Sequence, residues 1–238
     1  MLQLLKHTNA LICKLEDKIA KPLEIADFGD QQMEKHSYIM QRVREEIWPL
    51  HERIEKHSPL DVVAQGQASK EHYVLALKLL YGIIVPLENE LKRCALSMVN
   101  KPKFSGFMES TQWGRSQLLE CDLVVLGSSE SEIACLPFCS QVPQCGTPEQ
   151  ALAILYLLQG SRLGGKVIAS NVKSSLGYDE RTGCAYFSSN GCEIGHYWIA
   201  FKEFAQTNVD KEHESIMIES VKIYLIVMET WFKDASAL

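Results

Sequence analysis

The sequence lacks the features of a membrane-spanning, nucleic-acid-binding or disulfide-stabilised protein. No apolar stretch reaches the roughly 18 residues that a membrane span needs. No run of five basic residues occurs, and the formal net charge is −6, which argues against a nucleic-acid surface. The chain also has no CxxC pair and no hydrophobic signal-peptide core near its start. We therefore expect a cytoplasmic globular protein with neither a membrane span nor a nucleic-acid partner.

A sustained apolar alternation of period two, which would indicate half-buried strands, is also missing. Apolar residues instead recur at helical spacing, as at Met217, Val221, Tyr224 and Met228, so the sequence predicts an all-α fold. The expected helices cover residues 2–19, 41–57, 69–98, 113–126, 130–135, 147–176, 193–206 and 209–233.

Residues 1–40 differ from the remainder, because one amphipathic segment is followed by a polar, turn-prone stretch at Asp27-Phe28-Gly29-Asp30. We predict an N-terminal helical extension over residues 1–40 and a domain over residues 41–238. A domain of this size buries enough surface to fold without disulfides. The eight cysteines of the whole chain are therefore expected to be reduced thiols that pack as small hydrophobic side chains.

Three glycines interrupt a strongly helical, apolar segment at Gly160, Gly164 and Gly165. Each costs a helix roughly 0.5–1 kcal/mol relative to alanine. Two explanations compete: close contact with another helix, or a helix that lies against a planar ligand. Spacing alone favours helix contact.

A second feature is the pair His51 and Glu55, which are four residues apart and share one face of a helix. A carboxylate in that position can accept the second N–H of an imidazole, which orients the ring as a metal ligand. An ordinary surface pair would have the same spacing. Pro49 is unfavourable inside a helix and is expected to lie in its first turn.

Taken together, an imidazole on one helix and glycines on another are what binding a heme between two helices requires. Further motifs follow in chain order: Val43-Arg44-(x)6-His51-(x)3-Glu55, Tyr81-Gly82-(x)3-Pro86-Leu87-Glu88, Glu120-Cys121-Asp122-Leu123-(x)2-Leu126-Gly127, Gly160-Ser161-Arg162-Leu163-Gly164-Gly165-(x)2-Ile168 and Gly195-(x)2-Trp198-(x)2-Phe201. In order and spacing, over residues 41–232, the chain resembles bacterial biliverdin-producing heme oxygenases, and most closely the type associated with bacterial phytochromes.

The resemblance implies a single-domain, all-helical heme oxygenase fold with heme as both substrate and cofactor. The implied reaction uses dioxygen and an external electron donor, such as ferredoxin or another reductase, to open heme to biliverdin, carbon monoxide and ferrous iron. The product could serve a bacterial phytochrome or iron acquisition.

On the proximal side, the resemblance implies that His51 is the iron ligand and that Glu55 orients it. Heme propionates need cations, and Arg44 is the first candidate because it lies on nearly the same helical face as His51. Tyr197 and Lys202 are weaker candidates for heme contacts.

On the distal side, the resemblance assigns catalytic positions to Gly160, Ser161 and Gly164, with Gly165 close to the porphyrin. Animal members carry an aspartate where this chain has Ser161, so we expect Ser161 and backbone groups to hold an ordered water chain. Arg162 is expected to be a surface residue.

Other functions remain open at this point. The main alternative is a non-catalytic heme carrier on the same fold. A di-iron oxidase would need helical Glu-x-x-His pairs, and the one similar pair, Asp210 with His213, has no mate. An interaction scaffold would use the glycines only to pack helices.

Overall fold

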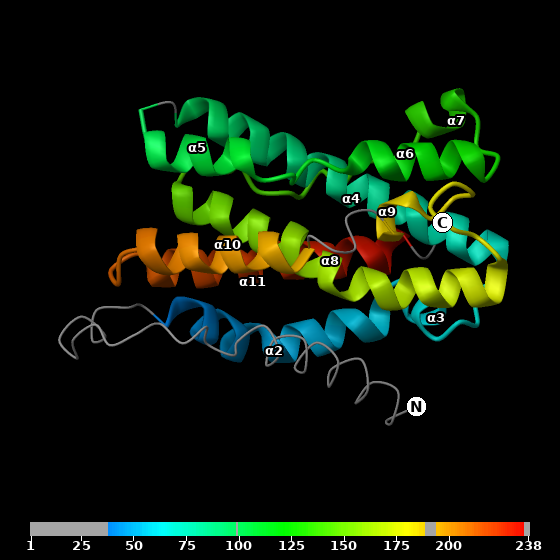
Figure 1. The fold of residues 1–238 in the computed structure, drawn as a ribbon, viewed down its shortest axis with the longest axis horizontal. Helices are drawn as coiled ribbons and strands as arrows, with labels where there is room; N and C mark the ends of the chain where they lie inside the picture. The colour runs from blue at the N-terminus through cyan, green and yellow to red at the C-terminus, as the bar shows by residue number, and fades with distance from the viewer. Residues whose placement is uncertain (1–37, 99, 189–193, 236–238) are drawn as a thin grey trace.

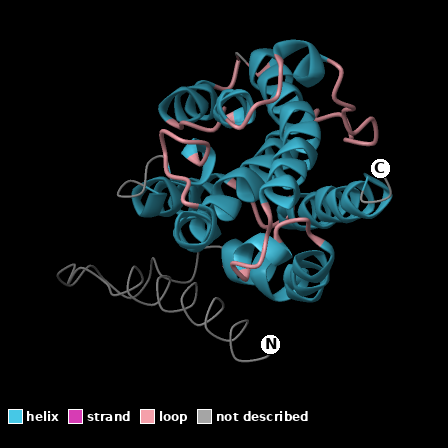
Figure 2. Ribbon diagram, turned by 90° about the vertical axis from the view of Figure 1, so that its right-hand side faces the viewer, coloured by secondary structure: helices cyan, strands magenta, loops and turns pink. Residues whose placement is uncertain are grey.

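The computed structural model describes residues 38–98, 100–188 and 194–235, and these residues form helices joined by turns and loops, without a strand (Figure 2). The all-α prediction is confirmed for this part of the chain. The expected helix over residues 2–19 lies outside it. The helices are α2 (Ile39–His57), α3 (Asp61–Ala64), α4 (Lys70–Ser97), α5 (Pro102–Ser110), α6 (Ser116–Val125), α7 (Glu130–Ala134), α8 (Pro148–Leu176), α9 (Ala185–Ser188), α10 (Ile194–Asn208) and α11 (Glu214–Ala235).

The long helices surround a common core, in which α11 packs against α2, α4 and α8 (Figure 1). Helix α4 also packs against α6 and α8. Helices α2 and α8 have three neighbours in common, because α3, α10 and α11 each contact both of them. This arrangement determines how the two candidate site helices are held relative to each other.

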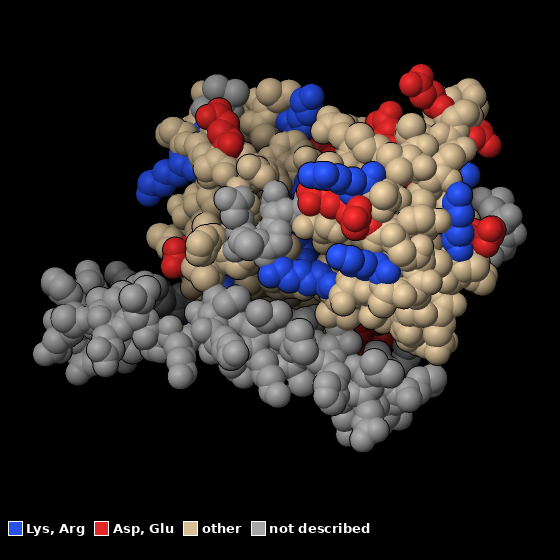
Figure 3. All heavy atoms as spheres, turned by 45° about the vertical axis from the view of Figure 1, so that its right-hand side comes forward, with Lys and Arg blue, Asp and Glu red and all other residues tan. Residues whose placement is uncertain are grey.

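Charged side chains of both signs lie close together on the surface, as Figure 3 shows for one face. Ion pairs also join α2 to α11 across about 170 residues of sequence. These pairs are Arg42 with Glu214, Lys222 Nζ with Glu46 Oε2 at 2.7 Å, and Arg53 Nη2 with Glu229 Oε2 at 2.7 Å.

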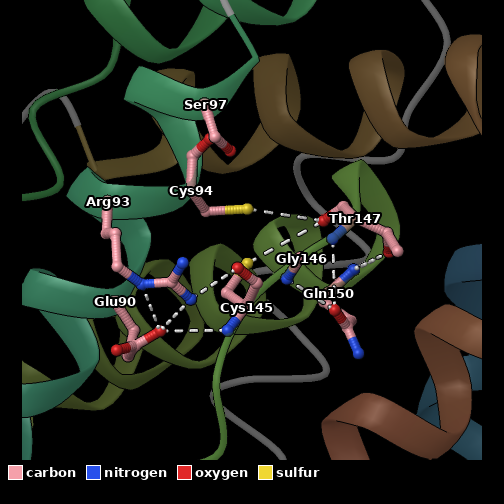
Figure 4. Close-up of polar contacts among 8 residues, drawn as sticks. All are labelled: Glu90, Arg93, Cys94, Ser97, Cys145, Gly146, Thr147 and Gln150. Atoms are coloured by element: carbon pink, nitrogen blue, oxygen red, sulfur yellow. Dashed lines mark hydrogen bonds and ion pairs between the residues drawn. The ribbon is translucent and has the colours of Figure 1, made fainter.

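The start of α8 is fixed by a local cap and by α4 (Figure 4). Thr147 Oγ1 accepts the backbone N–H of Gln150, and Gln150 Oε1 accepts the backbone N–H of Thr147, which forms a capping box. The preceding turn is held by α4, because Arg93 donates to the Cys145 carbonyl oxygen at 2.8 Å and Glu90 accepts the Cys145 N–H at 3.0 Å. The register of α8 is therefore set at its first turn.

Gly82 of α4 is required by close packing. A Cβ at this position would lie 2.5 Å from Cζ2 of Trp231 and 2.7 Å from the carbonyl oxygen of Pro137. Trp231 is held there by a 2.8 Å hydrogen bond from its indole N–H to the Leu79 carbonyl. The Gly82 carbonyl in turn accepts the N–H of Cys139 at 2.9 Å, so the glycine lets the loop after α7 and helix α11 approach α4.

Three short helices were not predicted: α3, α5 and α9. Pro102 is the first residue of α5, where its missing N–H costs nothing. The predicted helix over residues 209–233 begins later, at Glu214, because residues 211–213 form a turn with a 2.8 Å bond from His213 N–H to the Asp210 carbonyl. None of the described helices is long and apolar enough to cross a membrane.

The prediction that Pro49 lies in the first turn of its helix is wrong, because α2 begins ten residues earlier, at Ile39. Proline lacks the N–H that would bond to the carbonyl four residues before it, here that of Glu45. Pro49 and Glu45 are both exposed, so water can satisfy that carbonyl. An interior proline is tolerated on this face.

Candidate functional site

His51 and Glu55 lie side by side near the C-terminal end of α2, with Nδ1 of His51 3.4 Å from Oε1 of Glu55. The Nδ1 atom is buried and has no hydrogen bond in the structure, although 41% of the His51 side-chain surface is exposed. The exposed part of the ring therefore excludes Nδ1 and leaves the other nitrogen, Nε2, as the atom for an external ligand. Burial raises the pKa of the Glu55 carboxyl, against an opposing effect of His51.

Arg44, the expected propionate partner, is exposed on α2. The two weaker candidates, Tyr197 and Lys202, are half-buried on α10, the helix that contacts both α2 and α8. The ring of Tyr197 lies under the guanidinium of Arg162 at 5.2 Å. The candidates for anion binding are thus placed on two helices that pack together.

The three glycines of α8 have different surroundings. A Cβ on Gly165 would lie 3.3 Å from the carbonyl oxygen of Phe187 on α9, which is tight helix contact. A Cβ on Gly160 would meet only the edge of the Trp198 ring at 3.8 Å, and one on Gly164 would meet nothing within 4 Å. Packing therefore explains Gly165, but it gives no reason for glycine at position 164.

Ser161 is exposed and lies on α8 among these glycines. Its hydroxyl donates to the Leu158 carbonyl at 3.1 Å. The oxygen can still accept hydrogen bonds, since a hydroxyl has two lone pairs.

The prediction that Arg162 is a surface residue is wrong, because only 5% of its surface is exposed. Its guanidinium donates to Gln159 Oε1 at 2.7 Å and to the Gln112 carbonyl at 3.2 Å. These bonds, together with the Tyr197 ring, compensate for the desolvation of the charge. Arg162 joins α8 to α10 and to the loop before α6.

Asp122 was seen in the sequence only as part of a motif, and the structure shows what it does. It is 1% exposed, and its carboxylate accepts the backbone N–H groups of Ala185 at 2.7 Å and Tyr186 at 2.9 Å. These are the first two residues of α9, so Asp122 supplies the acceptors that a helix start lacks. A buried acidic residue inside an apolar helix was the available sequence signal.

The family model described as heme oxygenase matches residues 37–234. The chain belongs to the heme oxygenase family. The match covers most of the chain and includes every motif on which the resemblance was based. No curated protein matches the sequence.

Solved structures of bacterial heme oxygenases share the fold of this family member. The heme oxygenase of Leptospira interrogans is 16% identical, with a TM-score of 0.67 over 83% of this chain and 100% of that one. The heme oxygenase of Neisseria meningitidis, in its NO- and CO-bound forms, is 18% identical, with a TM-score of 0.58 over 84% and 92%. Heme oxygenase-1 of Synechocystis, in complex with heme, is 16% identical, with a TM-score of 0.59 over 84% and 93%.

Family membership makes this chain a heme oxygenase family enzyme and implies heme as its substrate. The residues of α2 and α8 fit that substrate chemically. His51 offers a ring nitrogen beside an orienting carboxylate, and Gly164 leaves its side of α8 open to a flat group. The comparisons assign no role to any single residue.

Proposed function

We propose that this protein binds heme between α2 and α8 and opens it to biliverdin, carbon monoxide and ferrous iron. The observation that carries the proposal is the pair His51 Nδ1 and Glu55 on α2. Helix α2 packs against three helices that also pack against α8, whose Gly164 side is open. Bound heme supplies the iron at which dioxygen is reduced. The residues of the chain hold the heme, orient it and supply hydrogen bonds.

His51 would be the protein ligand to the iron. With Nδ1 buried against the Glu55 carboxylate, the N–H tautomer at Nδ1 is favoured and the lone pair lies on Nε2. A hydrogen bond from Nδ1 to the carboxylate, formed when heme binds, would make the imidazole a stronger donor. Glu55 is then an orienting residue that never touches the iron.

Helix α8 would form the distal side of the site. Gly160 and Gly164 carry no side chain that could separate the helix backbone from the heme, while Gly165 fixes the distance between α8 and α9. Ser161, exposed between them along the helix, would bind water on this side. We assign catalytic positions to Gly160, Ser161 and Gly164, and to Gly165 the close packing of α8 against α9 beside the heme site.

The heme propionates would lie toward Arg44, with Lys202 and Tyr197 as further contacts from α10. An arginine can bind a carboxylate through two parallel N–H groups, and Lys202 adds a point charge. Neutralising Arg44 should weaken heme binding without abolishing it, because His51 still ligates the iron.

The subtype is also part of the proposal. The motif order supports the biliverdin-producing type associated with bacterial phytochromes, with a ferredoxin or another reductase as electron donor. A bacterial phytochrome would then accept the biliverdin. We place the reaction in the cytoplasm, where the free cysteines of the described chain stay reduced.

Residues 1–40 are proposed to be an extension to the heme-binding domain. Helix α2 begins at Ile39, so a chain that starts at residue 38 keeps every described helix. We expect that truncated chain to bind hemin and to turn it over at the full-length rate. Loss of folding on truncation would make the segment part of the core instead.

Turnover distinguishes the oxygenase from a heme carrier. The hemin-loaded protein is mixed in air with ascorbate, or with ferredoxin, its reductase and NADPH. We expect the heme absorption to fall while biliverdin absorption grows and carbon monoxide is released in equal amount. Heme that persists under these conditions would make the protein a carrier and refute the oxygenase proposal.

A further inference from the structure

Trp48 lies three residues before His51 on α2, and its indole stacks with the His51 imidazole. The ring centroids are 6.1 Å apart, and the two ring planes differ by only 9°. Residues three apart are neighbours on one face of a helix, and helical side chains lean back toward the preceding turn. The position and lean of His51 on α2 therefore bring its ring next to that of Trp48.

Packing in the described core does not explain a tryptophan at this position. Trp48 is half-buried, but among the described residues it belongs neither to the hydrophobic core nor to the partly buried side chains packed against that core. The other three tryptophans, at positions 113, 198 and 231, all do. The ring contact of Trp48 in this part of the chain is with His51. Its position therefore indicates a role connected with that histidine.

His51 needs neighbours that orient it, because rotation about the Cβ–Cγ bond of a histidine has only a weak intrinsic preference. Glu55 and Trp48 restrain this rotation in two different ways. The Glu55 carboxylate lies 3.4 Å from Nδ1, whereas the indole lies nearly parallel to the plane of the ring. Turning the imidazole about this bond would move Nδ1 away from Glu55 and tilt the ring out of the stacked arrangement. The two contacts together define one ring plane.

The burial of Nδ1 agrees with this arrangement. The atom is buried although 41% of the His51 side-chain surface is exposed. Water therefore does not compete with Glu55 for this nitrogen. A ring free to rotate would expose Nδ1 in part of its orientations, so a fixed ring plane is also what keeps Nδ1 beside the carboxylate.

We propose that Trp48 is a positioning residue for the heme ligand: its indole fixes the plane of the His51 imidazole, so that Nδ1 stays directed at Glu55 and the Nε2 lone pair at the iron. Trp48 acts through His51 and does not touch the iron. The inference rests on the proposed function and deepens it, because it adds a second orienting residue on the proximal helix, next to the stretch of α2 that carries His51 and Glu55.

The test is the iron–histidine stretching band of the ferrous heme complex, measured by resonance Raman spectroscopy. A hydrogen bond from Nδ1 to a carboxylate makes the imidazole a stronger ligand, which raises the frequency of this band. We expect Trp48→Leu to lower the frequency by several wavenumbers and to broaden the band, because the ring plane is no longer fixed. Trp48→Phe keeps an aromatic ring at this position and should retain most of the wild-type frequency.

Two further variants show whether Trp48 acts through the contact between His51 and Glu55. Glu55→Gln should lower the frequency, and adding Trp48→Leu to it should lower the frequency little further, because both residues act on the same ring. The control is Tyr38→Leu, which removes an aromatic side chain that is 66% exposed just before α2, and it should leave the band unchanged. Urea midpoints of the variants show that the fold is retained.

An unchanged band in Trp48→Leu would overturn the inference. So would a shift in Trp48→Phe as large as that in Trp48→Leu, or fully additive shifts in the double variant. Absence of the band from the wild type, or its persistence in His51→Ala, would instead refute His51 as the ligand and with it the proposed function. The two failures are therefore distinguishable.

Discussion

The carboxylate of Asp122 on α6 accepts the backbone N–H of Tyr186 on α9 at 2.9 Å and that of its neighbour Ala185 at 2.7 Å. Since α9 packs against Gly165 of α8, this contact also sets the position of α9 relative to the glycine segment. A carboxylate 64 residues away in sequence therefore shapes the candidate distal side.

Asp122→Ala should destabilise the protein by about 1–3 kcal/mol, because two buried N–H groups lose their acceptors. Urea unfolding followed by circular dichroism measures the change. Glu120→Gln, at an exposed carboxylate of the same helix, is the matched control and should have little effect. Equal stability of the two variants would show that α9 is held by other contacts.

Alanine substitutions at Gly164 and Gly165 should have opposite effects on stability. Gly164→Ala meets no atom within 4 Å, so it should keep or raise stability by about 0.5–1 kcal/mol through helix propensity. Gly165→Ala places a methyl 3.3 Å from the Phe187 carbonyl and should lower stability. Urea midpoints of the two apoproteins test this directly.

The same two alanine variants also distinguish a packing role of these glycines from a role in ligand binding. If Gly164 is glycine because a heme lies beside it, Gly164→Ala should weaken hemin binding or slow turnover despite its intact fold. Unchanged binding and turnover in Gly164→Ala would remove that glycine from the proposed site.

The ion pairs of the Glu229 carboxylate predict that the stability of the fold depends on pH in the acid range. Its hydrogen bonds with Arg53, and those with Lys233, lower its pKa to about 2 from a usual value of 4.5. A carboxyl whose pKa is lower in the folded chain stabilises the fold fully above pH 4.5, and this contribution is lost as the pH falls toward 2.

The urea midpoint of Glu229→Gln should therefore be lower than that of the wild type at neutral pH, and the difference should shrink as the pH falls through this range. A difference in urea midpoint that stayed constant down to a pH of about 2 would mean that the ion pair between Glu229 and Arg53 does not cause it. Glu219→Gln is a matched control, because Glu219 is an exposed carboxylate of the same helix.

The six cysteines among the described residues should fall into two classes of reactivity. Cys121 and Cys135 are exposed, whereas Cys94, Cys139, Cys145 and Cys184 are buried. Burial raises the pKa of Cys139 and Cys184, which slows their reaction further. With a thiol reagent and mass spectrometry, Cys121 and Cys135 should be labelled in the native protein and the buried four only after unfolding. Fast labelling of Cys184 would contradict the packing around α9.

Periodicity predicted the long helices because each buries a continuous apolar face. It failed for α3 and α9, which at four residues each are too short to show a period, and it also missed α5. Helix α9 forms because Asp122, far away in sequence, satisfies its first N–H groups. No local pattern can show a cap supplied by another helix.

The site was predictable where it rests on a single helix. The spacing of His51 and Glu55 placed their side chains together, and the structure has them 3.4 Å apart. The burial of Arg162 was not predictable, since its partner Gln112 is 50 residues away and lies in a loop. The role of Gly165 was also ambiguous, because only the position of Phe187 distinguishes packing from ligand contact.

The central proposal is that His51 ligates heme iron. We would titrate hemin into the wild type, into His51→Ala and into His72→Ala, an exposed histidine of α4, and record the Soret region. The wild type and His72→Ala should give the same one-to-one histidine-type spectrum, and His51→Ala should bind more weakly with an altered band. A spectrum from His51→Ala identical to that of the wild type would contradict the assignment of the ligand.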